Sequence, residues 1–205
     1  MRVITLVEDS LGEEQKKKGL DTEHGLSFFV ETENHNFLFD VGMSGIYRSN
    51  AEKLGVDVTK AEFLVLSHGH YDHGGGLNDF LENTKENVPV YLKGVAFGDY
   101  YSHRKTGLKY IGLEQELKEK YKSRLVYTED LYRINEEISI FSVARDTADY
   151  KDNIPAANTV LKKLSGDGEY VSDDFLHEQN LVVETDGKLV LMSACSHCGI
   201  ANIML

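Results

Sequence analysis

The sequence has no tryptophan, two prolines, two cysteines and no long apolar run. The cysteines, Cys195 and Cys198, lie close together near the carboxyl end, so they predict no disulfide framework. No apolar segment approaches the roughly 20 residues that a membrane-spanning helix needs. The amino terminus turns acidic too soon for a signal peptide. We therefore expect a cytoplasmic protein without membrane attachment.

Basic residues are also scarce, because the sequence has 22 lysines and arginines but 34 aspartates and glutamates, which gives a net charge of -12. A nucleic-acid-binding surface usually carries a basic stripe, and anionic membranes attract basic surfaces. We therefore expect neither nucleic acid nor membrane as a partner. An acidic shell still permits a locally cationic pocket once metal ions are bound. The length of 205 residues predicts a single domain, 1–205.

The most informative stretch is 67–76, which reads SHGHYDHGGG. It follows the apolar run 63–66, a predicted buried strand, and its glycines allow a sharp turn. His68 and His70 are two apart, so both rings leave an extended backbone on the same side. Asp72 and His73 follow beyond the bend and can serve a second ion. Imidazole and carboxylate suit zinc, manganese or iron, so we expect one or two divalent ions here.

The spacing His-x-His-x-Asp-His after a strand resembles the metal signature of the metallo-β-lactamase superfamily. The resemblance implies an α/β fold, the αββα sandwich of that superfamily. It also implies that a later strand brings another ligand to the first ion, and His197 is our choice. Asp40, which ends a predicted strand before a glycine, is implied to orient a ligand histidine.

Two other groups of residues resemble metal ligands but have simpler structural explanations. Cys195 and Cys198 match Cys-x-x-Cys, but without a second pair a zinc knuckle is not expected. A contact from Cys195 to the metal stays open, although packing is the simpler role for these small residues. His177 is predicted not to be a ligand, because its neighbours do not repeat the ligand spacing.

Local patterns predict alternating strands and helices, which favours a layered α/β architecture. Asp186-Gly187 between two β-branched runs predicts a tight hairpin, and Gly55 predicts the end of a helix. Residues 13–18 are expected to be a solvated loop. The predicted strands are 3–7, 24–32, 36–42, 63–66, 88–92, 138–143, 181–185 and 188–193, and the predicted helices are 46–54, 77–81 and 113–121.

Two excursions, 96–121 and 145–174, interrupt this pattern and are expected near the active site or at a partner surface. The first is aromatic and mixed in charge. It can present His103 and Arg104 to an anionic small-molecule substrate, although a packed surface segment explains it equally well.

Further stretches resemble one branch of the superfamily, typified by the 7,8-dihydropterin-6-methyl-4-(β-D-ribofuranosyl)aminobenzene-5′-phosphate synthase of methanopterin biosynthesis. They are 24–27 (HGLS), 178–181 (EQNL) and 195–200 (CSHCGI). His70 stands where the di-iron oxygen-reducing relatives carry Glu, which disfavours that redox branch. The sequence ends before the further strands, the helix and the last histidine ligand of the family pattern. The apolar residues near 200–205 favour self-association, as in a homodimer.

We expect a metal-dependent hydrolase that uses a metal-bound hydroxide on a phosphoester or a cyclic ester. Its metal ligands are predicted to be His68, His70, Asp72, His73 and His197, and Asp72 is also expected to handle a proton in catalysis. One alternative is a pterin-condensing synthase of the methanopterin type. The other is a truncated, inactive chain that binds only a metal or a partner.

Overall fold

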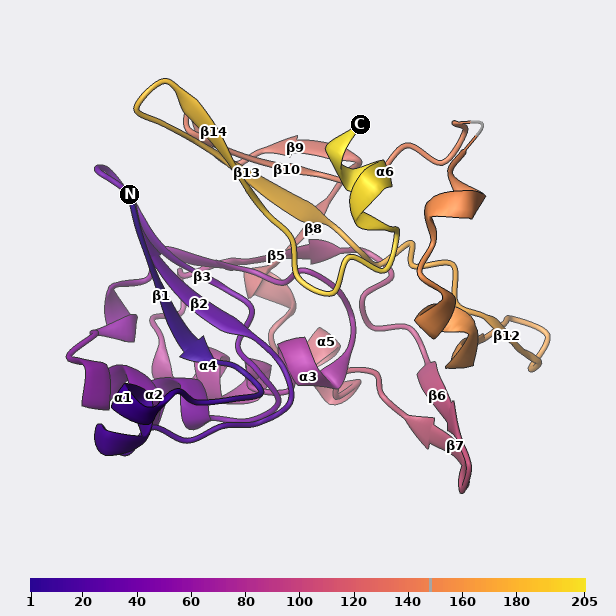
Figure 1. Cartoon of the computed structure of the whole chain (residues 1–205), viewed down its shortest axis with the longest axis horizontal. Coiled ribbons are helices and arrows are strands. Elements are labelled where there is room, and N and C mark those ends of the chain that lie inside the picture. Colours follow the sequence, from indigo (N-terminus) through magenta and orange to yellow (C-terminus); the bar gives the residue numbers. More distant parts are fainter. Residues whose placement is uncertain (148) are drawn as a thin grey trace. The chain divides into compact units, whose positions relative to one another are not determined.

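The computed structural model describes residues 1–147 and 149–205. The chain forms two compact units (Figure 1). Unit 1 comprises residues 1–66, 70–92 and 113–126, and unit 2 comprises residues 67–69, 93–112 and 127–205. Within the described residues, no helix is long and apolar enough to cross a membrane.

A mixed sheet has the strand order β1-β2-β3-β4-β5-β8, and its strands belong to unit 1 except for the last residue of β5 and the last two residues of β8. Strands β1, β2 and β3 pair antiparallel, and β3, β4 and β5 pair parallel. Successive residues of β3 and β4 are buried, as in central strands. The bounds are β1 Arg2–Val7, β2 Ser27–Glu31, β3 Asn36–Phe39, β4 Phe63–Val65, β5 Val90–Lys93 and β8 Leu125–Thr128.

Short helices connect these strands. Helix α2 ends where the sequence predicts, because Gly55 adopts the left-handed conformation with φ of 71°. Residues 13–18 do not form a loop throughout, since α1 covers most of them and two i,i+3 ion pairs stabilise it. The helices are α1 Glu13–Lys17, α2 Ile46–Leu54, α3 Tyr71–Gly74, α4 Leu77–Asn83 and α5 Glu116–Lys120, with 3-10 turns η1 Val58–Lys60 and η2 Lys122–Arg124.

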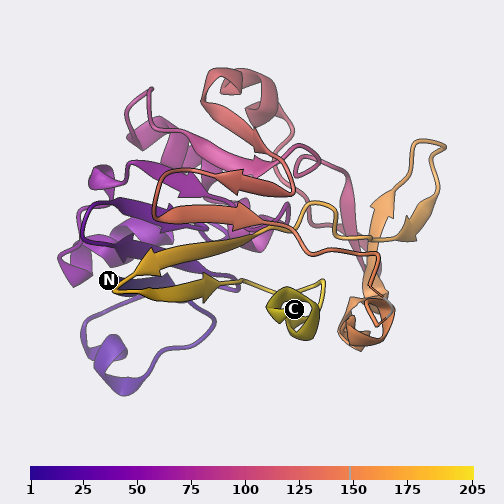
Figure 2. The same ribbon diagram turned by 90° about the horizontal axis from the view of Figure 1, so that it is seen from above.

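Unit 2 contains a sheet with the strand order β14-β13-β10-β9, whose orange-red and yellow strands lie side by side in Figure 2. Strands β13 and β14 form the predicted hairpin. Asp186 and Gly187 at its turn have φ of 53° and 67°, as a tight hairpin turn requires. The bounds are β9 Leu131–Arg133, β10 Ile138–Phe141, β13 Asn180–Thr185 and β14 Lys188–Met192. The short helix α6, Ile200–Met204, follows.

The two predicted excursions supply the second sheet of unit 2, with the order β12-β11-β6-β7. β6 and β7 come from the excursion 96–121, and β11 and β12 come from 145–174. The second excursion also holds the 3-10 turns η3 Lys151–Asn153 and η4 Ala156–Val160, and it includes residue 148, which lies outside the described residues. The bounds are β6 Tyr100–Arg104, β7 Gly107–Tyr110, β11 Leu161–Leu164 and β12 Tyr170–Ser172.

Candidate metal centre

The histidine-rich loop begins where β4 ends. His70 keeps an extended backbone, with φ of -95° and ψ of 147°, and precedes the first turn of α3. That turn carries Asp72 and His73. His68, His70 and His73 are at most 3% exposed, and Asp72 is also buried, at 8% exposed. Three buried imidazoles in one short loop call for polar partners, because an unsatisfied buried polar group is costly.

In unit 1, Asp40 holds the ring of His73. The Asp40 Oδ2 atom lies 2.7 Å from His73 Nδ1, and Asp40 is fully buried. Ser27 Oγ donates to the Asp40 carbonyl at 2.9 Å, and the Asp40 N–H donates to the carbonyl of Val65 at 3.0 Å. Asp40 thereby fixes one nitrogen of His73, and the other nitrogen, Nε2, lies 3.6 Å from Asp72 Oδ2. A carboxylate behind an imidazole is typical of metal-ligating histidines.

His24 reaches the same carboxylate of Asp72. Its Nε2 atom lies 3.4 Å from Asp72 Oδ2, and its Nδ1 atom lies 3.1 Å from both carboxylate oxygens of Asp9. The Gly25 N–H and the His24 ring lower the pKa of Asp9 below its usual value. His24 and Asp9 were not among the predicted site residues. The only signal was the stretch 24–27, which served to recognise the branch.

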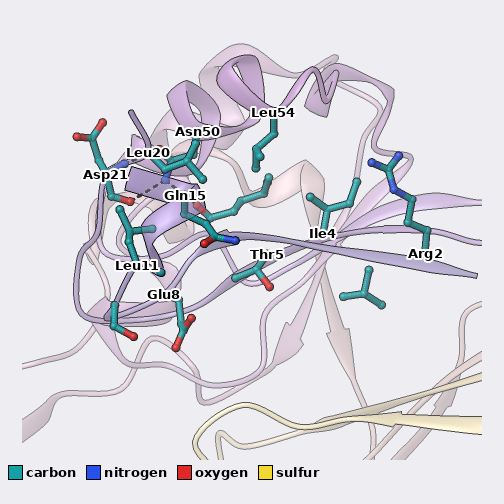
Figure 3. A pocket seen from close by; sticks show the side chains of 14 residues that line it. Arg2, Ile4, Thr5, Glu8, Leu11, Gln15, Leu20, Asp21, Asn50 and Leu54 are labelled. Carbon is teal, nitrogen blue, oxygen red and sulfur yellow. Dashed lines mark hydrogen bonds between the residues drawn. The ribbon is translucent and has the colours of Figure 1, made fainter. Parts of the chain in front are cut away.

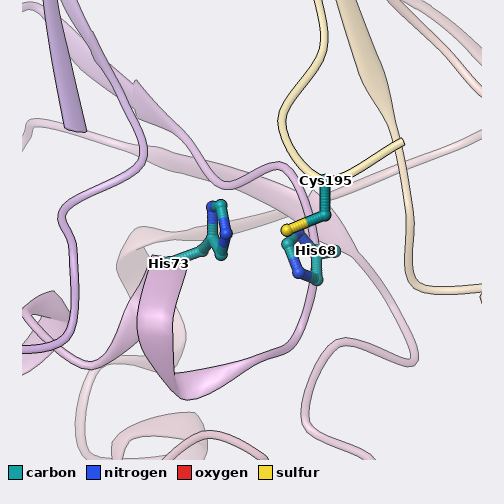
Figure 4. Close-up of side chains that lie close together, drawn as sticks. All are labelled: His68, His73 and Cys195. Carbon is teal, nitrogen blue, oxygen red and sulfur yellow. The ribbon is translucent and has the colours of Figure 1, made fainter. Parts of the chain in front are cut away.

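In unit 2, His68 lies near two residues that follow β14. The ligand atoms of His68 and His197 lie within 4.8 Å of each other, and those of His68 and Cys195 do so as well. Figure 4 shows the Cys195 thiol beside the ring of His68; it also labels His73, which belongs to unit 1. Ser67 Oγ lies 2.8 Å from His68 Nδ1, so the serine orients this ring.

Glu178 holds the loop that carries His197. Its two carboxylate oxygens accept the N–H groups of His197 at 2.6 Å and Cys198 at 2.8 Å. Asn158 Oδ1 lies 3.0 Å from His197 Nδ1, and the ring of Phe175 stacks on the imidazole at 4.7 Å between centroids. These roles were not predicted, because Glu178 and Asn158 are far from His197 along the chain.

His177 holds the glycine between the two first histidines. Its Nδ1 atom accepts the Gly69 N–H at 3.0 Å, and its Nε2 atom lies 3.1 Å from Asp173 Oδ2. The ring is fully buried and lies 4.0 Å from the Tyr100 ring centroid. Both nitrogens of His177 thus have protein partners. This arrangement suits a residue that positions the loop of His68 better than it suits a metal ligand.

The two cysteines have different surroundings. Burial, followed by the nearby Glu178 carboxylate, raises the pKa of the Cys198 thiol to about 12. Cys198 therefore stays a neutral thiol and packs with Tyr150 and Phe175. Cys195 is exposed, and its sulfur lies near His68 as described above. Thiolate is a good zinc ligand, which makes Cys195 a candidate donor beside His68.

His103 and Arg104, the two predicted substrate contacts, lie on β6. His103 and Arg104 are exposed and pair with Leu108 and Gly107 at the tip of the β6–β7 hairpin.

A pocket of about 540 Å³ in unit 1 is lined by β1, the loop after it, α1 and part of α2 (Figure 3). Asn50 lines it and donates to the Asp21 carbonyl at 2.9 Å. The residues that line this pocket include none of the predicted metal ligands.

The donor sets fit a divalent metal ion. Each unit offers imidazole nitrogens together with a carboxylate or a thiol, and these are ligand types for zinc, manganese and iron. Protein groups hold the remaining ring nitrogens of His68, His73 and His197. In metal sites, protein groups commonly hold the ring nitrogen that does not bind the metal and so orient the imidazole.

The model of the metallo-beta-lactamase superfamily matches residues 20–147, which is more than half of the chain. The chain therefore belongs to the metallo-beta-lactamase superfamily, and the predicted fold class is confirmed. The superfamily is metal-dependent, in agreement with the clusters of possible ligands described above.

Two proteins of Methanocaldococcus jannaschii are similar to most or all of the chain. It is 31% identical over 184 residues to an uncharacterized protein of Methanocaldococcus jannaschii, covering 89% of this chain and 66% of that protein. It is 27% identical to the 7,8-dihydropterin-6-methyl-4-(beta-D-ribofuranosyl)-aminobenzene-5'-phosphate synthase of the same organism, covering 100% and 70%. The resemblance to the branch of this synthase is thus confirmed.

A solved structure is also similar. The crystal structure of Tm1679, a metal-dependent hydrolase of the beta-lactamase superfamily, matches with a TM-score of 0.75 and 30% identity, covering 98% of this chain and 68% of that one. The chain thus spans about two thirds of the length of these relatives.

Proposed function

We propose that the chain is a metal-dependent hydrolase of anionic small molecules, either phosphoesters or cyclic esters. The main observation behind this proposal is that a protein group holds one ring nitrogen of several of these histidines. The clearest case is His73, whose Nδ1 atom is held by Asp40. Similarity to a metal-dependent hydrolase over nearly the whole chain supports the same reaction class. Zinc is the proposed metal, with manganese and iron as alternatives.

The proposed ligands are His68, His70 and His197 for one ion and Asp72 and His73 for a second. A bound divalent ion supplies Lewis acidity and lowers the pKa of water toward neutrality. Asp40 holds Nδ1 of His73, and Nε2 of the same ring lies 3.6 Å from Asp72 Oδ2. Asp72 is proposed to accept the proton that the attacking water loses, and its low exposure limits competition from solvent.

The test measures hydrolysis by the full chain after loading with zinc or manganese. The substrates are bis(p-nitrophenyl) phosphate and a set of lactones. We expect His68→Ala and His73→Ala each to lower kcat/KM at least about 100-fold, because each removes a metal ligand. His35→Ala is the matched control, since this histidine also pairs with a carboxylate, that of Glu62 at 2.9 Å, but lies in the turn between β2 and β3.

A metal-loaded chain that hydrolyses none of these substrates would contradict the proposal. Equal activity of His73→Ala and His35→Ala would contradict the assigned ligands instead. The two failures are therefore distinguishable in one set of measurements.

A second candidate is the pterin-condensing synthase reaction, favoured by the full-length similarity to the methanopterin synthase. Aromatic rings lie near one another in the β12-β11-β6-β7 sheet, where Tyr101 contacts Tyr110 and Tyr170 at centroid distances of 5.4 and 4.9 Å. Such rings can stack on a flat substrate. Incubation with a dihydropterin diphosphate and an aminobenzene ribofuranosyl phosphate distinguishes the two reactions, because only the synthase forms the condensed product.

A further inference from the structure

Another cavity, of about 390 Å³, lies within unit 2. Residues of the turns η3 and η4 and the segment 172–175 line it. Its aromatic wall consists of Tyr150 and Phe175, which are at most 8% exposed and pack with Cys198 in a small hydrophobic core. Ile154 and Pro155 add apolar surface. A cavity of this volume with an aromatic wall fits a small organic ligand.

Phe175 on this wall has a strained backbone. Its φ of 52° is a left-handed conformation that bulky side chains rarely adopt. The Asp173 carboxylate accepts the Phe175 N–H at 2.8 Å, and Arg145 donates to the Phe175 carbonyl at 2.7 Å. The ring lies nearly parallel to the imidazole of His197, with 4.7 Å between centroids and 8° between planes. Strain of this kind gathers at ligand sites, and here one ring both lines the cavity and contacts His197.

Asn158 connects the same cavity with His197 through polar contacts. It lines the cavity, its Nδ2 atom donates to the His197 carbonyl at 2.7 Å, and its Oδ1 atom lies 3.0 Å from His197 Nδ1. A ligand in the cavity would therefore contact the two residues that orient this imidazole.

The charges on the wall favour an anion. Arg145 and Lys151 line the cavity, and Arg145 donates to two main-chain carbonyls, which carry no net charge. The wall also holds two carboxylates, but protein donors already bind them. Asp173 accepts a main-chain N–H at 2.8 Å, and Asp174 pairs with Lys163. The positive charge of the two basic residues thus remains to be balanced by a ligand.

We propose that this cavity binds a small aromatic molecule that carries an anionic group, either a carboxylate or a phosphate. Its ring packs against Tyr150 and Phe175, and its charge is balanced by Arg145 and Lys151. The inference goes beyond the proposed function and does not depend on it, because it involves no bound metal. Ligand binding changes the surroundings of the His197 imidazole, since the ligand and this ring share Phe175 as a neighbour.

The experiment titrates the full chain, stripped of metal so that no ester is hydrolysed, with benzoate and with phenyl phosphate. Benzyl alcohol is the neutral probe. Nuclear magnetic resonance follows backbone amides and histidine imidazoles, and His197→Gln identifies the His197 signal. Ala156→Trp fills the cavity, and Ala157→Trp is the matched control, because Ala157 is also exposed on η4 but is not a lining residue.

A second pair of variants tests the charge. Lys151→Gln removes one cation from the wall, and Lys188→Gln removes an exposed cation on β14 as its control. Circular dichroism melting shows that each variant folds.

We expect saturable shifts with a dissociation constant of about 1 mM for at least one anion, together with a shift of the His197 signal. Ala156→Trp should weaken binding at least about 10-fold, because the indole occupies the space of the ligand, whereas Ala157→Trp should not. Lys151→Gln should weaken it about 3-fold, and Lys188→Gln should match the wild type. Tighter binding of phenyl phosphate than of benzoate would identify a phosphate ligand, and the reverse would identify a carboxylate.

Three results would overturn the inference. They are the absence of saturable binding by either anion, equal binding by Ala156→Trp and Ala157→Trp, and binding of benzyl alcohol as tight as that of the anions. Each would leave the proposed function standing, because metal-dependent hydrolysis needs no ligand in this cavity.

Discussion

At the scale of single residues, the candidate site depends on backbone conformations that most side chains avoid. Asp40 has φ of 59° and Ser196 has φ of 53°, and both lie beside proposed ligands or their partners. Non-glycine residues in this region are uncommon and cost energy, and they gather at functional sites. Asp40 tolerates the strain because its carbonyl, N–H and carboxylate all have partners.

Gly25→Ala should destabilise the protein more than an ordinary glycine substitution. The new Cβ would meet the Asp72 carbonyl at 1.8 Å, in addition to the strain of an alanine at φ of 133°. We expect a loss of about 3 kcal/mol or more in the free energy of unfolding, measured from urea midpoints. Gly19→Ala is the control, because Gly19 has φ of 70° with open space around it, and about 1 kcal/mol is expected there. Equal losses would contradict the close approach of Gly25 to α3.

At the scale of elements, unit 1 is joined by a buried arginine after α5. The Arg124 guanidinium donates to the carbonyl of Val88 at 2.9 Å, to the carbonyl of Leu81 at 2.7 Å and to Thr84 Oγ1 at 2.7 Å. It thereby connects η2 with the end of α4 and the start of β5. Burial lowers the pKa of Arg124, although guanidinium stays charged at neutral pH.

Arg124→Met should lower the stability of the protein by about 3 kcal/mol, because two buried carbonyls and the partly buried Thr84 hydroxyl lose charged donors while the apolar stem is kept. Arg124→Lys should recover only part of the loss, since one ammonium does not match the planar fork. The measurement is again the urea midpoint. Arg133→Met serves as the control, because exposed Arg133 donates to the nearby carbonyls of Asn135 and Glu136, and a change within about 0.5 kcal/mol is expected.

The segment between β12 and β13 has a positioning role in unit 2. His177 holds Gly69, the Gln179 N–H donates to the Ser67 carbonyl at 2.8 Å, and Glu178 holds the amides of His197 and Cys198. Three consecutive residues thus fix the loop of His68 and the loop of His197. Their sequence shows no ligand spacing, and the groups that they hold here are backbone N–H and carbonyl groups.

At the scale of the whole molecule, metal binding should contribute to stability. The net charge of -12 disfavours the compact state through self-repulsion, and bound cations offset it locally. A metal at 100 times its dissociation constant stabilises the folded state by about 2.7 kcal/mol. For a chain of this size, we expect chelation to lower Tm by roughly 5 to 10 °C.

Scanning calorimetry of the zinc-loaded and EDTA-treated chains measures this difference. Sodium chloride at equal ionic strength is the control, because it screens charge without occupying a ligand site. The His73→Ala variant should show a smaller response to chelation than the wild type. A Tm that is the same with and without EDTA would argue against a resident metal.

The sequence by itself determined the features whose cause is local. Gly55 ends α2 because of its own conformational freedom, and Asp186-Gly187 turns the β13–β14 hairpin for the same reason. The ligand types in residues 68–73 and their spacing likewise identified the superfamily, because a few neighbouring side chains carry that chemistry.

Only the tertiary structure decided which distant residues meet. It joined β6 and β7 with β11 and β12 in one sheet, although the sequence showed two separate excursions. It also brought Asp9 and His24 to Asp72, and Glu178 to the loop of His197. Strand pairing and side-chain contacts between residues far apart in the sequence depend on how the whole backbone folds. Local propensity therefore does not predict them.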